Sequence, residues 1–158
     1  MTLDGDVARL SRTPPFRFLP REAVQLIAFA SEKRRWKTGE TLFHAGEAGD
    51  SGYFVHSGTI LLSGAAPGLA RRIGPGALIG ESALYAPVTR RVEARVVEEA
   101  VLTRVPRETF RRVLAEFPPA TAQIRSALAS RTRRLVDRLD AARAGLLEPG
   151  GTNPRKGP

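Results

Sequence analysis

The sequence predicts a mainly β fold: a β-roll, or double-stranded jelly-roll-like barrel, with a helix before it and a long helix after it. Between residues 39 and 105, short apolar runs are separated by glycines at intervals of roughly 8–12 residues, which is typical of an all-β sandwich or barrel. Residues 92–96, VEARV, alternate apolar and charged side chains, as a half-buried strand does. The segments outside this region instead have helical spacing.

Two helical segments are expected before the first strand. Residues 1–13 form a short helix or an arm, which ends at Pro14–Pro15. Residues 19–35, LPREAVQLIAFASEKRR, are expected to be helical, because Pro20 suits a first turn and apolar side chains recur on one face. Residues 37–40, KTGE, are expected to form a turn before the roll.

Glycines are expected at the corners of the roll, where the backbone needs conformations that other residues resist. The roll domain is assigned to residues 14–117, and its last strands to VEARVV and AVLTRVP. The expected corner glycines are Gly39, Gly46, Gly49, Gly58, Gly64, Gly74, Gly76 and Gly80.

A short helix and a long helix are expected to follow the strands. Residues 106–117 have apolar side chains on one face, and Pro118–Pro119 break or kink the chain after them. Residues 118–147 carry a narrow apolar stripe flanked by arginines, which favours pairing with a second copy of the helix over packing on its own β domain. Residues 148–158 are expected to be a disordered tail.

The composition limits the classes of function. The 158 residues include no cysteine, which excludes disulfide scaffolds, thiol nucleophiles and cysteine-based metal sites. The first residues lack the apolar segment of a signal peptide, and no run approaches the roughly 18 apolar residues of a membrane span. We therefore expect a soluble, cytoplasmic protein without a membrane partner. The net charge of +9 fits nucleic-acid binding, anionic membranes or simply arginine-rich codon usage, so charge alone identifies no partner.

A metal-binding cupin is the natural β-barrel alternative, but the sequence offers little for it. A cupin centre needs several imidazoles and a carboxylate, whereas the chain has only His44 and His56, each alone in its segment. We expect both to be packing or edge residues. With no nucleophile–base grouping either, the sequence predicts neither an enzyme nor a metal site.

Two stretches resemble the cyclic-nucleotide-binding domain, the sensor domain of the catabolite activator protein, of protein kinase A regulatory subunits and of cyclic-nucleotide-gated channels. Residues 42–58, LFHAGEAGDSGYFVHSG, are similar to the family's glycine–acid corner, apolar strand and closing glycine. Residues 79–84, IGESAL, followed after five residues by Arg90, look like its phosphate-binding cassette. The order of helix, roll, short helix and long helix also matches over about residues 14–147.

The resemblance implies a cyclic nucleotide as the ligand, with cyclic AMP the first candidate, and no other cofactor. A guanidinium such as that of Arg90 matches two phosphate oxygens, and the carboxylate of Glu81 accepts a hydrogen bond from the ribose hydroxyl. Gly80 allows a close backbone approach. Ser82 and Ala83 begin a short helical turn whose N–H groups face the phosphate, and the small Ala83 keeps the cleft open.

The sequence departs from the family at three positions. Arg91 and Val92 stand where the family usually has small residues after the cassette arginine, and Gly52 replaces a large apolar residue. Arg91 is a candidate ligand residue: pointing outward it is harmless, and pointing inward it adds a second cation, which suits a more anionic ligand such as a cyclic dinucleotide or blocks the site.

The long helix is expected to supply the base contact and the dimer interface, and to transmit ligand binding to an unknown protein partner. Thr132 is the candidate base contact, with Ser130 nearby and Arg131 and Arg133 able to stack on a purine. No segment resembling a helix-turn-helix follows residue 147, so direct DNA binding is not expected. Two alternatives stay open: a degenerate domain that binds no nucleotide and serves as a dimeric scaffold, and a fragment of a larger transcription regulator or channel.

Overall fold

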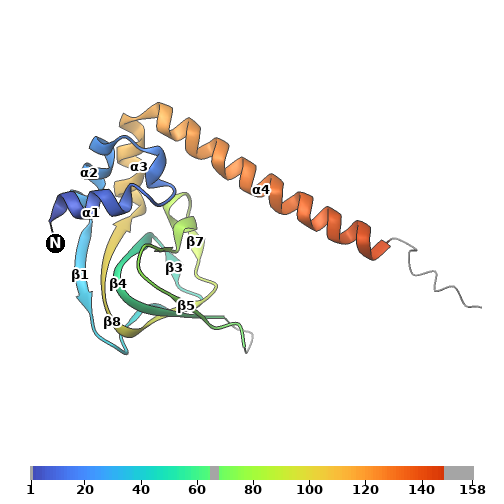
Figure 1. Ribbon diagram of the computed structural model, residues 1–158, viewed down its shortest axis with the longest axis horizontal. Helices are drawn as coiled ribbons and strands as arrows, with labels where there is room; N and C mark the ends of the chain where they lie inside the picture. The colour runs from blue at the N-terminus through green and yellow to red at the C-terminus, as the bar shows by residue number, and fades with distance from the viewer. Residues whose placement is uncertain (1, 65–67, 148–158) are drawn as a thin grey trace, which may run out of the picture. The chain divides into compact units, whose positions relative to one another are not determined.

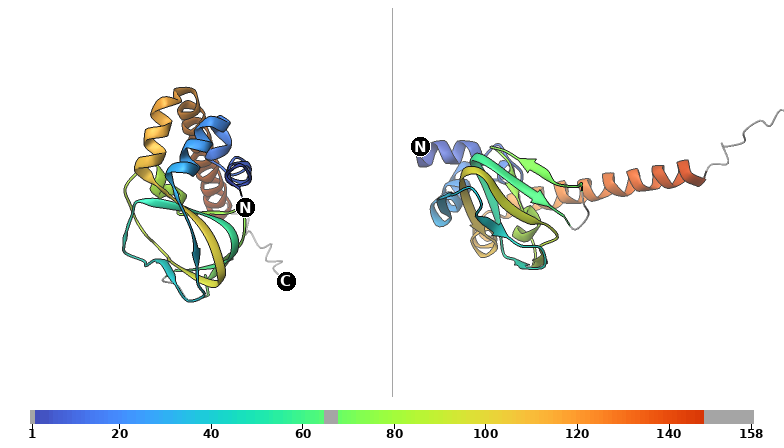
Figure 2. Two further views of the ribbon diagram at one scale, coloured as in Figure 1. Left: turned by 90° about the vertical axis from the view of Figure 1, so that its left-hand side faces the viewer. Right: turned by 90° about the horizontal axis from the view of Figure 1, so that it is seen from below.

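The computed structural model describes residues 2–64 and 68–147, with side chains up to residue 143. The chain divides after Thr121 into two units, which are described separately. The first unit is a β-roll with helices gathered at one end, as Figures 1 and 2 show from three sides. The mainly β prediction is confirmed for this unit. The predicted tail, residues 148–158, lies outside the described residues.

Short helices interrupt or flank the strands. The helices are α1 (Leu3–Leu10), η1 (Phe16–Phe18), α2 (Arg21–Ala30), η2 (Glu81–Leu84), α3 (Arg107–Glu116) and α4 (Pro118–Leu147). The strands are β1 (Glu32–Trp36), β2 (Thr41–Phe43), β3 (Ala48–Gly49), β4 (Ser51–Ser63), β5 (Arg71–Ile73), β6 (Leu78–Ile79), β7 (Val88–Thr89) and β8 (Glu93–Pro106). The larger sheet has the order β1-β8-β4-β5, with β2 on β8 and β6 on β4, while β3 pairs with β7.

The antiparallel pair of β4 and β8 forms the frame of the roll. β4 has 13 residues and β8 has 14, and each is one continuous strand where the sequence predicted two separate runs. The expected corner at Gly58 is wrong, because Gly58 lies inside β4, whereas Gly49 is the last residue of β3. Gly58 has a φ of +88°, and an added Cβ would collide with the carbonyl oxygen of Glu99. The register shifts around Gly58 show a β-bulge, which bends the long strand without ending it.

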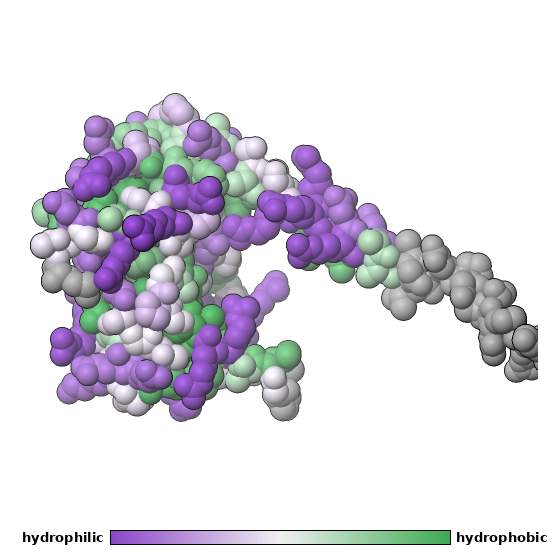
Figure 3. Space-filling view, in the orientation of Figure 1, coloured by the Kyte–Doolittle hydropathy of each residue, from purple (hydrophilic) through white to green (hydrophobic). Residues whose placement is uncertain are grey.

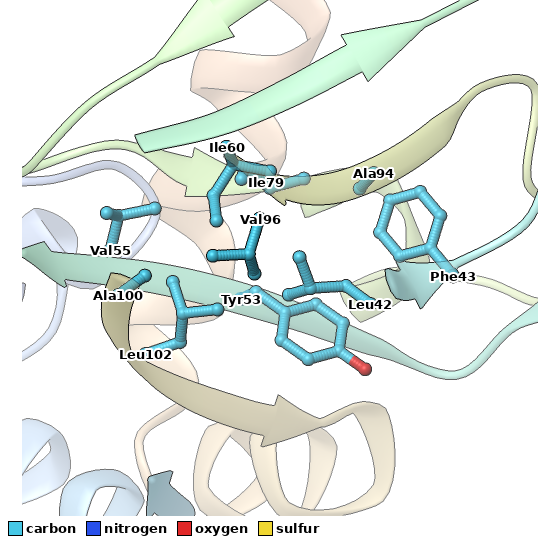
Figure 4. Close-up of a cluster of buried hydrophobic side chains, with 10 residues drawn as sticks. All are labelled: Leu42, Phe43, Tyr53, Val55, Ile60, Ile79, Ala94, Val96, Ala100 and Leu102. Carbon is cyan, nitrogen blue, oxygen red and sulfur yellow. The ribbon is translucent and has the colours of Figure 1, made fainter. Parts of the chain in front are cut away.

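The core of the roll is an apolar cluster between the curved strands (Figure 4). Ala94 and Val96 are buried and Arg95 is exposed, so the predicted alternation of β8 is confirmed. The cluster consists of Leu42, Phe43, Tyr53, Val55, Ile60, Ile79, Ala94, Val96, Ala100 and Leu102.

The helix predicted for residues 19–35 is too long. α2 ends at Ala30, and residues 32–36 form the strand β1, which pairs with β8 from Glu32 opposite Arg104 to Trp36 opposite Ala100. Four of these five side chains are exposed, so β1 lacks the alternation by which a strand is recognised. Pairing with a distant segment, and not local preference, therefore determines this conformation.

The second unit begins at Ala122 and contains all but the first four residues of α4. α4 spans Pro118–Leu147, as predicted, and begins where the two prolines end α3. Its visible face is mainly hydrophilic in Figure 3, yet Leu135 and Leu139 are 56% and 61% exposed. Among the described residues, no helix is apolar enough over a sufficient length to span a membrane.

A buried polar cluster links α1 to the roll. The Nε2 atom of His56 lies 2.6 Å from the Thr103 hydroxyl, and its Nδ1 lies 3.6 Å from the Asp6 carboxylate. Asp6 also accepts a hydrogen bond of 2.7 Å from the Lys33 ammonium. Burial lowers the pKa of His56; the Asp6 charge opposes this effect, while Lys33 and Arg9 add to it.

The His56 cluster predicts a pH-dependent stability. Because the pKa of His56 is lowered in the folded protein, the unfolded chain takes up the proton more readily below the ordinary histidine pKa of 6.5. The free energy of unfolding should therefore fall as the pH falls from about 7 to about 5, with this residue contributing at most about 1.4 kcal/mol per pH unit. Urea unfolding across this range measures the slope.

Two histidine variants separate this effect from general acid sensitivity. His56→Gln should flatten the slope between pH 7 and pH 5, whereas His44→Gln should leave it unchanged, because His44 is 63% exposed. Equal slopes in the wild type and His56→Gln would contradict the assignment.

Candidate functional site

The backbone on both sides of Arg90 is held by the loop that leads into β3. The N–H of Arg90 donates to the Glu47 carbonyl at 2.7 Å, and the Arg90 carbonyl accepts from the Gly46 N–H at 2.8 Å. These bonds extend the pairing of β3 with β7 by one residue. They place the side chain of Arg90 inside the protein, where the residue is only 7% exposed.

The guanidinium of Arg90 has few protein partners. Its Nη2 donates to the Ser51 carbonyl at 2.6 Å, and its carbon atom lies 4.1 Å from the centre of the Phe43 ring. Within the described part of the chain, no carboxylate oxygen lies within 4.0 Å of it. Burial lowers the pKa of Arg90, and the nearby Tyr53 and Asp50 oppose this, but a guanidinium stays charged in proteins. Among the described residues, this buried positive charge thus has no carboxylate within ion-pair distance, although the charges of Asp50 and Glu47 act on it from farther away.

Two glycines form the walls beside this guanidinium. A Cβ on Gly49 would lie 2.9 Å from the Arg90 Nε, and a Cβ on Gly80 would collide with the Arg90 Nη1. Gly80 also has a φ of +74°, a conformation that residues with a Cβ adopt at a cost. The sequence predicted a close backbone approach at Gly80; in the structure the group that approaches is the arginine itself.

The predicted short turn after Gly80 is confirmed as η2. The Glu81 carboxylate accepts a hydrogen bond of 2.6 Å from the Tyr85 hydroxyl, and Ser82 is exposed. Ala83 is fully buried, and its N–H already donates to the Gly80 carbonyl at 3.1 Å. The phosphate-facing role of the N–H of Ser82 stays a prediction.

The other two predicted ligand residues, Arg91 and Thr132, lie on exposed positions. Arg91 is exposed although its neighbour Arg90 is buried, as expected for adjacent extended residues that face opposite sides. Thr132 lies on α4, in the second unit, and is exposed. Neither role is tested by the structure, and both stay predictions.

The structure accounts for the small residue at position 52. A Cβ on Gly52 would lie 3.3 Å from the Leu78 side chain and 3.4 Å from that of Leu84. Leu84 belongs to η2 and is fully buried. The missing side chain at Gly52 therefore makes room for η2 to pack onto β4.

Three site residues were missed by sequence reasoning: Phe43, Gly49 and Ser51. All lie in or beside the glycine–acid stretch that carried the resemblance, but no pattern indicated that they contact Arg90. Ser51 acts through its backbone carbonyl, which any residue type could supply. Among the described residues, no group of three or more potential metal-ligating side chains is placed to hold an ion.

The contact between Gly80 and Arg90 predicts a specific effect of substitution. Gly80→Ala should displace the guanidinium and break its bond to Ser51, in addition to straining the backbone. Gly76→Ala is the matched control, because Gly76 has a φ of +89° but nothing within 4 Å of an added Cβ. We expect Gly80→Ala to lower the free energy of unfolding by about 0.5–1.5 kcal/mol more than Gly76→Ala. If urea unfolding shows the same loss of unfolding free energy in Gly80→Ala and Gly76→Ala, Arg90 is not held against Gly80.

Comparison with known proteins gives relatives along most of the chain. A cyclic AMP receptor protein from Thermus thermophilus is 30% identical over 132 residues, which are 81% of this chain and 61% of that protein. A lysophospholipase from Neosartorya fischeri is 29% identical over 76% of this chain, but over only 8% of its own length. The chain thus spans at most about three fifths of these curated relatives.

A solved structure and a family model agree with this similarity. The N-terminal domain of a transcriptional regulator from Streptomyces coelicolor superposes with a TM-score of 0.74 at 28% identity, covering 83% of this chain and 94% of that one. The family model of the cyclic nucleotide-binding domain matches residues 33–117, which include β1 to β8, η2 and α3. The chain therefore belongs to the cyclic nucleotide-binding domain family.

Proposed function

We propose that this protein is a sensor module that binds a cyclic nucleotide with Arg90. The observation that carries the proposal is the buried guanidinium of Arg90, which has one carbonyl acceptor and no carboxylate within ion-pair distance in the described chain. Burying an unpaired charge is costly, and an anion that enters the site removes that cost. The cyclic phosphodiester supplies one negative charge and two oxygens that match a guanidinium.

The cassette turn supplies groups for the sugar. The Glu81 carboxylate accepts a bond from the Tyr85 hydroxyl, and in the proposed complex it also accepts one from the ribose 2′-hydroxyl. The N–H of Ser82 is the candidate donor to the phosphate. Ala83 is buried, so it contributes to the shape of the proposed site and makes no polar contact with the ligand.

A cyclic mononucleotide is favoured over a cyclic dinucleotide. Arg91 is exposed, so of the two adjacent arginines only Arg90 is buried in the proposed site. The cassette then offers one cation for the single charge of a cyclic mononucleotide. Cyclic AMP is the first candidate, because the Thermus thermophilus relative is named as its receptor. Thr132 of α4 is kept as the candidate base contact.

The proposed output is a ligand-dependent change in α4 that an unknown protein partner detects in the cytoplasm. A ligand shifts such an equilibrium only if it binds one arrangement of the helix better than the other. The module would act by binding, without catalysing a reaction. The exposed side chains of Leu135 and Leu139 favour a homodimer formed through α4.

Calorimetry with cyclic AMP, cyclic GMP and cyclic dinucleotides tests the binding proposal. Arg90→Ala should weaken nucleotide binding at least tenfold, about 1.4 kcal/mol, because the phosphate loses its ionic partner. Arg91→Ala is the matched control, since it removes the same charge from the adjacent exposed position, and it should change the affinity less than threefold. Unchanged affinity in Arg90→Ala would exclude Arg90 from the site. No heat from any of these nucleotides at high micromolar concentration would favour the dimeric scaffold.

The homodimer is tested by substitutions on α4. Leu135→Gln combined with Leu139→Gln should convert the dimer to a monomer in light scattering, because both apolar side chains would lie in the helix seam. Arg134→Gln combined with Arg138→Gln is the control on the same turns of the helix and should leave the mass unchanged. A monomeric wild type would contradict the proposed dimer.

A further inference from the structure

Arg107, the first residue of α3, joins three segments around the proposed site. Its Nη1 lies 2.9 Å from the Gly49 carbonyl oxygen and 3.2 Å from those of Ala83 and Ala86. The N–H of Arg107 also donates to the Asp50 carbonyl at 2.7 Å. The start of α3 is thus bonded to the β3–β4 junction through its backbone and to the cassette turn through its side chain.

The three carbonyls come from the two walls that enclose Arg90. The backbone of Gly49 touches the Arg90 guanidinium on one side, and Gly80, at the start of η2, touches it on the other. Arg107 bonds to the carbonyl of Gly49, to that of Ala83 inside η2, and to that of Ala86, two residues after η2 ends. A single guanidinium therefore sets the distance between these walls.

Packing holds the side chains at the C-terminal end of the cassette turn, because Ala83 and Leu84 are fully buried and the Tyr85 ring lies edge-on to the Phe110 ring. Arg107 bonds to its carbonyl oxygens. η2 is a short 3-10 helix, and the last carbonyls of a helix lack partners within it. A cation at this end satisfies these oxygens and interacts favourably with the helix dipole. Without Arg107, the carbonyls of Ala83 and Ala86 would turn to water, and the turn could move away from Gly49.

We propose that Arg107 is a positioning residue for the anion site: it holds η2 against Gly49 so that the groups around Arg90 are in place before the ligand arrives. This inference rests on the proposed nucleotide site. A preformed pocket binds more tightly because the ligand does not have to order it. Arg107 touches carbonyl oxygens and not Arg90, so its effect passes through the backbone of the two walls.

Hydrogen-exchange mass spectrometry without ligand tests the positioning role directly. In Arg107→Met, exchange in the peptide covering residues 80–88 should accelerate at least tenfold, while the strands β4 and β8 keep their wild-type rates. Arg107→Lys retains a cation, but with a single nitrogen and a shorter reach than a guanidinium, and its exchange rate should fall between those of Arg107→Met and the wild type. Arg111→Met is the matched control. Arg111 is exposed on the same helix and, together with Arg107, lines a surface cavity of about 600 Å³. Its substitution should leave the exchange rate of residues 80–88 unchanged.

Calorimetry on the same variants tests the link to binding. Arg107→Met should weaken cyclic AMP binding about tenfold, Arg107→Lys less, and Arg111→Met not measurably. Unchanged exchange at residues 80–88 would overturn the positioning role. So would a uniform rise in every strand, which would show general destabilisation. Faster exchange at residues 80–88 with wild-type affinity would overturn the link to the ligand.

The two proposals fail in different ways. If the wild type binds no nucleotide but Arg107→Met still loosens residues 80–88, the proposed function is wrong and the positioning of η2 by Arg107 stands. If the wild type binds and Arg107→Met changes neither exchange nor affinity, the site stands and the role of Arg107 is wrong.

Discussion

The burial of one guanidinium is the constraint on which the site depends. Arg90 is 7% exposed and lies against the Phe43 ring, with the backbones of Gly49 and Gly80 at its sides. Any Cβ at these two glycines would occupy space that the guanidinium takes. Burying the positive charge is costly, and the structure shows one short bond from it to the Ser51 carbonyl. In the proposed function, a bound anion supplies the ionic partner that offsets this cost.

The long strands β4 and β8 bring the parts of the site together. Ser51 begins β4, and Gly49 ends β3 just before it, while Arg107 follows directly on the end of β8. The pairing of Ser51 with Pro106 places these chain segments side by side, although more than fifty residues separate them. A bulge at Gly58 bends β4 around the apolar cluster without breaking this pairing. The site is therefore positioned by two continuous strands, and the short elements β3, β7 and η2 are attached to them.

The sequence predicted the features that have a local cause and missed those that depend on distant contacts. The glycine spacing indicated the roll, and the prolines at 118–119 marked the start of α4. Turns and helix ends depend on the backbone preferences of a few adjacent residues, so they can be recognised locally. The strand β1 was missed because its charged, exposed residues carry no alternation; only β8 makes it a strand. Gly58 was taken as a corner because a glycine inside a strand and a glycine at a turn look the same in sequence. Arg90 was identified through its spacing from Glu81. Ser51 instead contributes its backbone carbonyl, and Arg107 donates to the backbone carbonyl of Gly49, and no residue pattern encodes either contact.

The only tryptophan of the chain gives the protein a built-in optical reporter. The guanidinium carbon of Arg34 lies 3.5 Å from the centre of the Trp36 ring. The Trp36 and Tyr53 rings are arranged edge to face, with their centres 6.3 Å apart. The centres of the Tyr53 and Phe43 rings are 6.1 Å apart, and the Arg90 guanidinium lies over the face of the Phe43 ring. Two ring-to-ring contacts thus connect the indole to the buried cation. A rearrangement of Arg90 that shifts Phe43 would alter the surroundings of the indole, and its emission could be followed in the unlabelled protein.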